Sequence, residues 1–358
     1  MTIYQAMQLD VKSCKENIRK ACNKKEKREY ALALVLKDIG CVLFAILFIS
    51  MMNLFFGNAN SSAAVVIFCI LLMAREIDFG YDIKSSMFHL FLTFLILAVS
   101  PCIAQRYGTG IGLCVNLFSV GFLMLTVCRQ PLYGGAGLYL FGYLFLYGNP
   151  VEGHDFFLRI MEMLAGFLIC GTVFWVKHHE KKDREPFSKL LKQFSIFDQV
   201  GRWQVQVTLG VVLGIFIGEL LHMERLMWMG CSCLTVLSQY GEEPKKRAFQ
   251  RVGGVIAGSL LFGILYQVWP ESMQSMIGVV SGLCLGLCAA YHWKTLLNCF
   301  GALIMASSLF GVGTAIVLRI VNNVAGCCFG IFFYYIYHWI MDWLEKKRGG
   351  AGLQSAGQ

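Results

Sequence analysis

Two eight-residue stretches combine an arginine, a polar residue three positions later and a glycine seven positions later. Residues 159–166 are RIMEMLAG and residues 319–326 are RIVNNVAG, so four of the eight positions are identical. In a helix, an arginine, the residue three on and the residue seven on lie on the same face. Because each stretch opens a long apolar segment near the end of its half of the chain, we interpret the pair as an internal duplication.

These residue types could bind a negatively charged solute. A guanidinium offers several hydrogen-bond donors in a planar arrangement that fits a carboxylate. The candidate substrate-binding residues are Arg159 with Glu162 in the first stretch and Arg319 with Asn322 and Asn323 in the second, and we expect the two faces to meet. Structural alternatives stay open: Arg159 could pair with Glu162 or extend to the membrane surface, and Arg319 could brace two helices.

The composition predicts an all-α integral membrane protein. Hydrophobic residues make up 57% of the 358 residues and charged residues 15%. Apolar runs approach or exceed the roughly 20 residues that a helix needs to cross the hydrocarbon, and they lack the alternation of membrane β-strands. No cleavable signal peptide is expected, because the first 36 residues are polar and Lys-rich.

We predict about twelve transmembrane helices in two parallel six-helix repeats, covering residues 38–176 and 203–343. A basic helix (1–37), a basic linker (177–202) and a tail (344–358) would lie in the cytoplasm, with part of the linker forming an amphipathic surface helix over 187–197. The expected spans are 38–56, 61–74, 86–104, 110–128, 133–148, 156–176, 203–221, 226–240, 250–268, 273–291, 294–311 and 313–341.

The charge distribution predicts the location and the partners. The formal net charge is +9, but nearly all Lys and Arg residues fall on alternate connections. That is the positive-inside pattern of a multi-pass protein in the cell (inner or plasma) membrane with both termini in the cytoplasm. We therefore expect contact with anionic lipid and no nucleic-acid partner, and a homo-oligomer stays open.

The chain offers little else that could do chemistry. We find no nucleophile elbow, phosphate-binding loop or metal-ligand spacing, so we expect no enzyme activity, no catalytic residue, no metal and no cofactor. Glu219 is a candidate proton-coupling residue, although pairing with Arg225 is the alternative. The second and eighth spans are short, which is typical of broken helices beside a substrate site, or of local thinning of the bilayer.

From Met227 to Gly263 the chain resembles the fusaric-acid-resistance-like superfamily, which includes the aromatic acid exporters. The resemblance lies in Trp228 at the start of a short span and in a run that looks like the family signature Arg-x-x-Gly-Thr-x-x-Gly. That run contains Arg251, Gly254 and Gly258, with Gly254 where Thr is usual. The large soluble domain that many relatives carry between the halves is missing.

The resemblance implies proton-driven export of aromatic carboxylic acids across the inner membrane. Two alternatives remain at this stage. One is a passive organic-anion channel, and the other is an envelope or scaffold protein that transports nothing.

Overall fold

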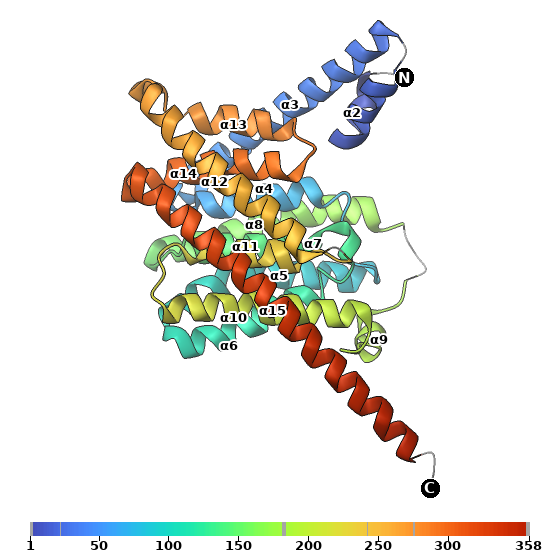
Figure 1. The fold of residues 1–358 in the computed structure, drawn as a ribbon. Helices are drawn as coiled ribbons and strands as arrows, with labels where there is room; N and C mark the ends of the chain where they lie inside the picture. The colour runs from blue at the N-terminus through green and yellow to red at the C-terminus, as the bar shows by residue number, and fades with distance from the viewer. Residues whose placement is uncertain (1–2, 22, 181–183, 242, 275, 356–358) are drawn as a thin grey trace. The chain divides into compact units, whose positions relative to one another are not determined.

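The computed structural model describes residues 3–21, 23–180, 184–241, 243–274 and 276–355. These residues form helices joined by short connections, and none of them lies in a strand (Figure 1). The all-α prediction is therefore confirmed for the described part of the chain. Residues 181–183 of the predicted linker, and 1–2 and 356–358 at the predicted cytoplasmic ends, lie outside it.

Eight of the described helices are long and apolar enough to cross a membrane. Each is at least 18 residues long, which gives about 27 Å or more at 1.5 Å per residue and matches the hydrocarbon thickness. They are α3 (Lys24–Phe56), α5 (Ile83–Arg106), α6 (Gly108–Leu125), α8 (Gly153–His178), α10 (Gln199–Leu220), α12 (Pro244–Val268), α14 (Tyr291–Phe310) and α15 (Val312–Ser355).

Four further apolar helices have only 11 to 13 residues. They are α4 (Ser61–Met73), α7 (Gly135–Tyr147), α11 (Leu226–Leu237) and α13 (Met276–Gly286), and each coincides with a predicted span. At about 17 to 20 Å they are shorter than the hydrocarbon core. Eight spans are thus supported by length and composition, and twelve spans remain a prediction.

Helix ends differ from the prediction where charged residues continue a helix beyond its apolar part. The N-terminal segment is α1 (Ile3–Met7), α2 (Val11–Lys20) and the first turns of α3, instead of one separate basic helix. At the other end α15 continues to Ser355, through most of the predicted tail. Lys and Glu are good helix formers, so neither run stops the helix. In the linker, α9 covers Phe187–Lys192 and ends earlier than predicted.

The chain divides into two compact units that do not coincide with the predicted halves. Unit 1 contains Met1–Ser50 and Phe249–Asn323, and unit 2 contains Met51–Ala248 and Val324–Gln358. The two parallel repeats therefore stay a prediction, as do the domain boundaries drawn from them.

In unit 2, α8 packs against α4 and α5, while α10 packs against α6 and α11; α10 and α6 run side by side in Figure 1. Glycine permits these close contacts. A methyl group at Gly166 of α8 would lie 2.7 Å from Ile67 of α4, and one at Gly214 of α10 would lie 3.3 Å from Phe329 of α15. Small residues at these two positions let neighbouring helices approach closely, which is usual for helices that associate in lipid.

Candidate functional site

Arg159 lies in the second turn of α8 and is completely buried. Its guanidinium donates three hydrogen bonds to two stretches of the chain: Nε to Asn60 Oδ1 (3.0 Å) and Nη2 to Ser62 Oγ (3.1 Å) in one, and Nη1 to the Asn149 carbonyl (2.7 Å) in the other. All three acceptors are neutral. The side chain therefore does not extend to the surface, and its positive charge is held by dipoles rather than by a carboxylate.

Asn60 orients this guanidinium. Asn60 belongs to the short 3-10 helix η1 (Asn58–Asn60) and is fully buried. Its Nδ2 donates to the Phe56 carbonyl (3.1 Å) at the end of α3 and to the Asp155 carbonyl (3.0 Å) at the start of α8. Because the amide nitrogen is used in this way, Oδ1 faces Arg159, and one amide connects α3, α8 and the arginine.

Glu162 lies one turn further along α8 and is also completely buried. Neither carboxylate oxygen has a hydrogen-bond partner among the described residues. The predicted pairing of Arg159 with Glu162 is therefore wrong: the neutral acceptors from neighbouring segments already surround the guanidinium. A buried carboxyl group without a donor is an expensive feature, and such groups inside membrane proteins often belong to a solute path.

A cavity of about 370 Å³ lies beside Arg159. It is lined by the end of α5, which includes Arg106, by the connection Pro150–Gly153, which includes Glu152, and by Phe156; Arg159 itself is not part of the lining. Cys102 forms part of its wall, and Arg159 Nη1 lies 4.0 Å from Cys102 Sγ. The guanidinium is therefore directly behind the wall of a cavity large enough for a small organic molecule.

Glu219, at the end of α10, accepts a hydrogen bond from the Tyr147 hydroxyl of α7. No contact with Arg225 occurs, so the alternative pairing proposed from the sequence is wrong; Arg225 has left-handed backbone (φ 56°) in the turn before α11. One turn earlier in α7, the Tyr143 hydroxyl donates to Asn116 Oδ1 of α6 at 2.6 Å. Polar groups thus line the contacts among α6, α7 and α10.

Sequence reasoning missed this row of tyrosines, although a signal was present. Tyr139, Tyr143 and Tyr147 recur every four residues, which places their side chains on one face of α7, and all three are buried. A stripe of hydroxyl-bearing side chains on one face of an apolar helix indicates buried polar partners.

Arg319, Asn322 and Asn323 lie on α15 and are buried, with 5%, 1% and 0% of their surface exposed. The Asn322 amide donates to the Leu318 carbonyl (2.8 Å) and the Asn323 amide to the Arg319 carbonyl (2.7 Å). These amide nitrogens therefore bond their own helix. The expected meeting of this face with that of Arg159 stays a prediction.

The signature residues pack α12 against α14 within unit 1. A methyl group at Gly254 would lie 2.9 Å from the His292 carbonyl, and one at Gly258 would overlap the Leu296 backbone. Arg251 Nη1 donates to the Tyr291 hydroxyl at 3.3 Å. Glycine at both positions thus permits a backbone approach that any larger residue would prevent. Trp228 is buried in α11 of unit 2.

Residues 211–333 match the model of the fusaric acid resistance protein-like family. The resemblance predicted from the sequence is thereby confirmed for this segment, which contains the signature run as well as Arg319, Asn322 and Asn323. The matched segment is about a third of the chain and does not include Arg159. The chain matches no curated protein and no solved structure. Together with the long apolar helices, the match identifies a multi-pass membrane protein and points to a role in transport or efflux.

Proposed function

We propose that the protein is an inner-membrane transporter that exports small organic anions of the aromatic carboxylic acid class expected from the sequence, with the proton gradient as the driving force. The observation that carries the proposal is the buried Arg159 guanidinium. Among the described residues, all of its hydrogen-bond acceptors are neutral, and it lies behind Cys102 in the wall of the 370 Å³ cavity. A cation whose charge no carboxylate contacts keeps its attraction for an entering anion.

The family match supports the substrate class. Its description names resistance to fusaric acid, which is an aromatic carboxylic acid, and export is a direct route to such resistance. The cavity beside Arg159 combines apolar side chains such as Ile103 and Phe156 with the charged Arg106 and Glu152, so it can take an apolar ring that carries a carboxylate. The second half of the chain would contribute its own anion-binding residues, which lie inside the matched segment: Arg319, Asn322 and Asn323.

Glu162 is the group that we assign to proton coupling. A carboxyl group that no donor contacts can gain or lose a proton without breaking an existing hydrogen bond. Because it lies one helical turn from Arg159, its charge would change the attraction that an anion feels there. Glu219 is the second candidate, but its carboxylate already accepts the Tyr147 hydroxyl.

Tolerance of cells to aromatic acids tests the proposal. The full chain is expressed in a bacterial host that is sensitive to salicylate and benzoate, and growth is measured beside membrane abundance. Wild-type protein should raise tolerance, whereas Arg159→Lys should not, because an ammonium cannot reach three separated acceptors. Arg28→Lys, at an exposed position of α3, is the matched control and should behave as wild type.

Equal tolerance with Arg159→Lys and wild-type protein at equal abundance would refute the role of Arg159. Unchanged tolerance with wild-type protein, accompanied by altered cell shape, would instead indicate a scaffold protein.

A further inference from the structure

A second pocket, of about 530 Å³, lies in unit 2 away from Arg159. It is formed by the turn that follows α6 (residues 129–133), by α9 with the residues up to Ser195, and by the first turns of α10. Its volume is within the range of about 300 to 1,000 Å³ that is usual for small-molecule sites.

One wall of the pocket is the apolar face of α9 and the turn after it. Four apolar residues spaced as on one helix face line the pocket: Phe187, Leu190, Leu191 and Phe194. Leu191 and Phe194 keep 48% and 37% of their surface exposed, so the protein leaves this wall partly uncovered. Lys189 and Lys192 do not line the pocket.

Arg129 is the one positively charged residue in the described lining of this pocket. It makes no hydrogen bond or ion pair with any residue that the structure describes. Burial lowers the pKa of its guanidinium, and the nearby Tyr81 hydroxyl opposes that change. Asp198, which is exposed, is the one acidic residue of the lining. An apolar wall beside an unpaired guanidinium is the arrangement that suits a molecule with an anionic end and an apolar body.

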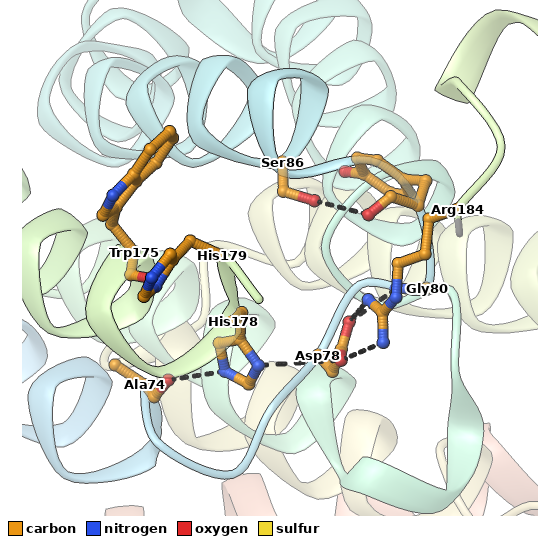
Figure 2. Close-up of polar contacts among 9 residues, drawn as sticks. Ala74, Asp78, Gly80, Ser86, Trp175, His178, His179 and Arg184 are labelled. Atoms are coloured by element: carbon orange, nitrogen blue, oxygen red, sulfur yellow. Dashed lines mark hydrogen bonds and ion pairs between the residues drawn. The ribbon is translucent and has the colours of Figure 1, made fainter. Parts of the chain in front are cut away.

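An ion pair between the partly buried Arg184 and the buried Asp78 anchors the segment just before α9 (Figure 2). The Arg184 guanidinium donates two hydrogen bonds to the Asp78 carboxylate, which also accepts from the Gly80 backbone nitrogen at 3.0 Å. His178 Nδ1 approaches the same carboxylate at 3.6 Å, while its Nε2 lies 3.1 Å from the Ala74 carbonyl. The hydrogen bonds to Asp78 raise the pKa of Arg184, so the guanidinium stays charged at neutral pH.

Two further contacts extend this attachment to α9 itself. The Asp82 nitrogen donates to the Glu185 carbonyl at 3.1 Å, and the Phe187 ring lies 4.3 Å from the His89 ring. Gly80, which lines the pocket, has left-handed backbone (φ 86°), and a methyl group there would overlap the Gln130 side chain. The segment that anchors the linker therefore also shapes the pocket.

We propose that this pocket binds an amphipathic organic anion, whose anionic group contacts Arg129 and whose apolar body lies against α9. A free aromatic carboxylate and an anionic lipid share this chemistry. The binding itself does not depend on transport, whereas identification of the ligand with the exported acid rests on the proposed function.

Equilibrium dialysis of 1-naphthoate against the full chain in phosphatidylcholine nanodiscs tests the proposal. All proteins compared carry Arg159→Lys, so that the transport site does not bind the probe. Arg129→Gln in that background should lower the affinity about tenfold or more, because a charge-assisted contact is lost. Asp198→Asn should raise the affinity, because it removes a negative charge that repels the anionic ligand. Lys192→Gln, on the exposed face of α9, should leave it unchanged. Equal affinity with and without Arg129→Gln in the Arg159→Lys background, or an equal loss with Lys192→Gln, would overturn the site.

Two further variants separate the pocket from its surroundings. Arg184→Gln should weaken binding although Arg184 does not line the pocket, because α9 loses its attachment to Asp78. Arg159→Lys should lose transport but retain naphthoate binding at Arg129. The pocket proposal and the transport proposal can therefore be refuted separately. If phosphatidylglycerol in the nanodisc abolishes naphthoate binding to wild-type protein, the occupant is a lipid; if it does not, the occupant is the free acid.

Discussion

Replacement of Asn60 by Asp distinguishes a transport role of Arg159 from a purely structural one. The change is nearly isosteric and does not alter the arginine itself. It replaces the neutral Oδ1 acceptor, 3.0 Å from Arg159 Nε, with a carboxylate. If the guanidinium only braces the helices, the new ion pair should preserve the brace. If it attracts an anion, the added carboxylate should neutralise that attraction.

The magnitude follows from Coulomb's law. At an effective dielectric constant of about 20, a guanidinium attracts an anion about 6 Å away by roughly 2.8 kcal/mol. A carboxylate beside the guanidinium cancels most of this, which corresponds to about a 100-fold weaker binding of the anion. The free energy of unfolding should change much less, because the new ion pair offsets the loss of the two hydrogen bonds that Asn60 Nδ2 donates to the Phe56 and Asp155 carbonyls.

Asn60→Ala provides the contrast in the same assays. It leaves the buried Arg159 Nε without its acceptor and removes the donor to the Phe56 and Asp155 carbonyls, so we expect a loss of about 3 to 5 kcal/mol of stability. Thermal unfolding in detergent and salicylate flux into proteoliposomes measure the two effects. Salicylate flux through Asn60→Asp at the wild-type rate and equal abundance would refute the reasoning about the charge of Arg159.

Three more predictions concern other buried positions. Gly258→Ala should destabilise the protein by about 1 to 3 kcal/mol in thermal unfolding, because the added methyl group overlaps the backbone of α14; Gly253→Ala, where the methyl group meets nothing within 4 Å, should be neutral or stabilising by up to about 1 kcal/mol. Tyr147→Phe should cost about 1 to 3 kcal/mol in the same measurement, because Glu219 loses its donor, and stability equal to wild type would contradict that contact. Glu162→Gln should keep normal abundance and allow only downhill salicylate flux, so retained uphill flux would exclude Glu162 as the coupling group.

Local sequence patterns predicted the apolar helices well. Each of the twelve expected segments contains one of the apolar helices, because each consists of apolar residues bounded by polar or glycine-containing connections. Helix ends were predicted less well where a charged run adjoins an apolar one, as at Lys24 and beyond Met341. Hydropathy marks the residues that lie in the hydrocarbon, whereas the helix can continue into charged residues outside it.

Partners of the candidate site could not be predicted in the same way. The i, i+3 spacing of Arg159 and Glu162 predicted a pair, yet Arg159 bonds Asn60 and Ser62, which are almost 100 residues earlier in the chain. Such contacts depend on which helices pack together, and an i, i+3 rule only states which groups are neighbours on one helix surface. Burial of Arg159 and Arg319 could be anticipated, but not the neutral surroundings of Arg159.

Uphill flux in proteoliposomes tests the central claim most directly. The 358-residue chain is reconstituted, a proton gradient is imposed and labelled salicylate is followed across the membrane. We predict accumulation against the salicylate gradient that stops when a protonophore is added and that Asn60→Asp abolishes. No flux, or a passive salicylate current that is independent of the proton gradient, would contradict proton-driven export of an organic anion.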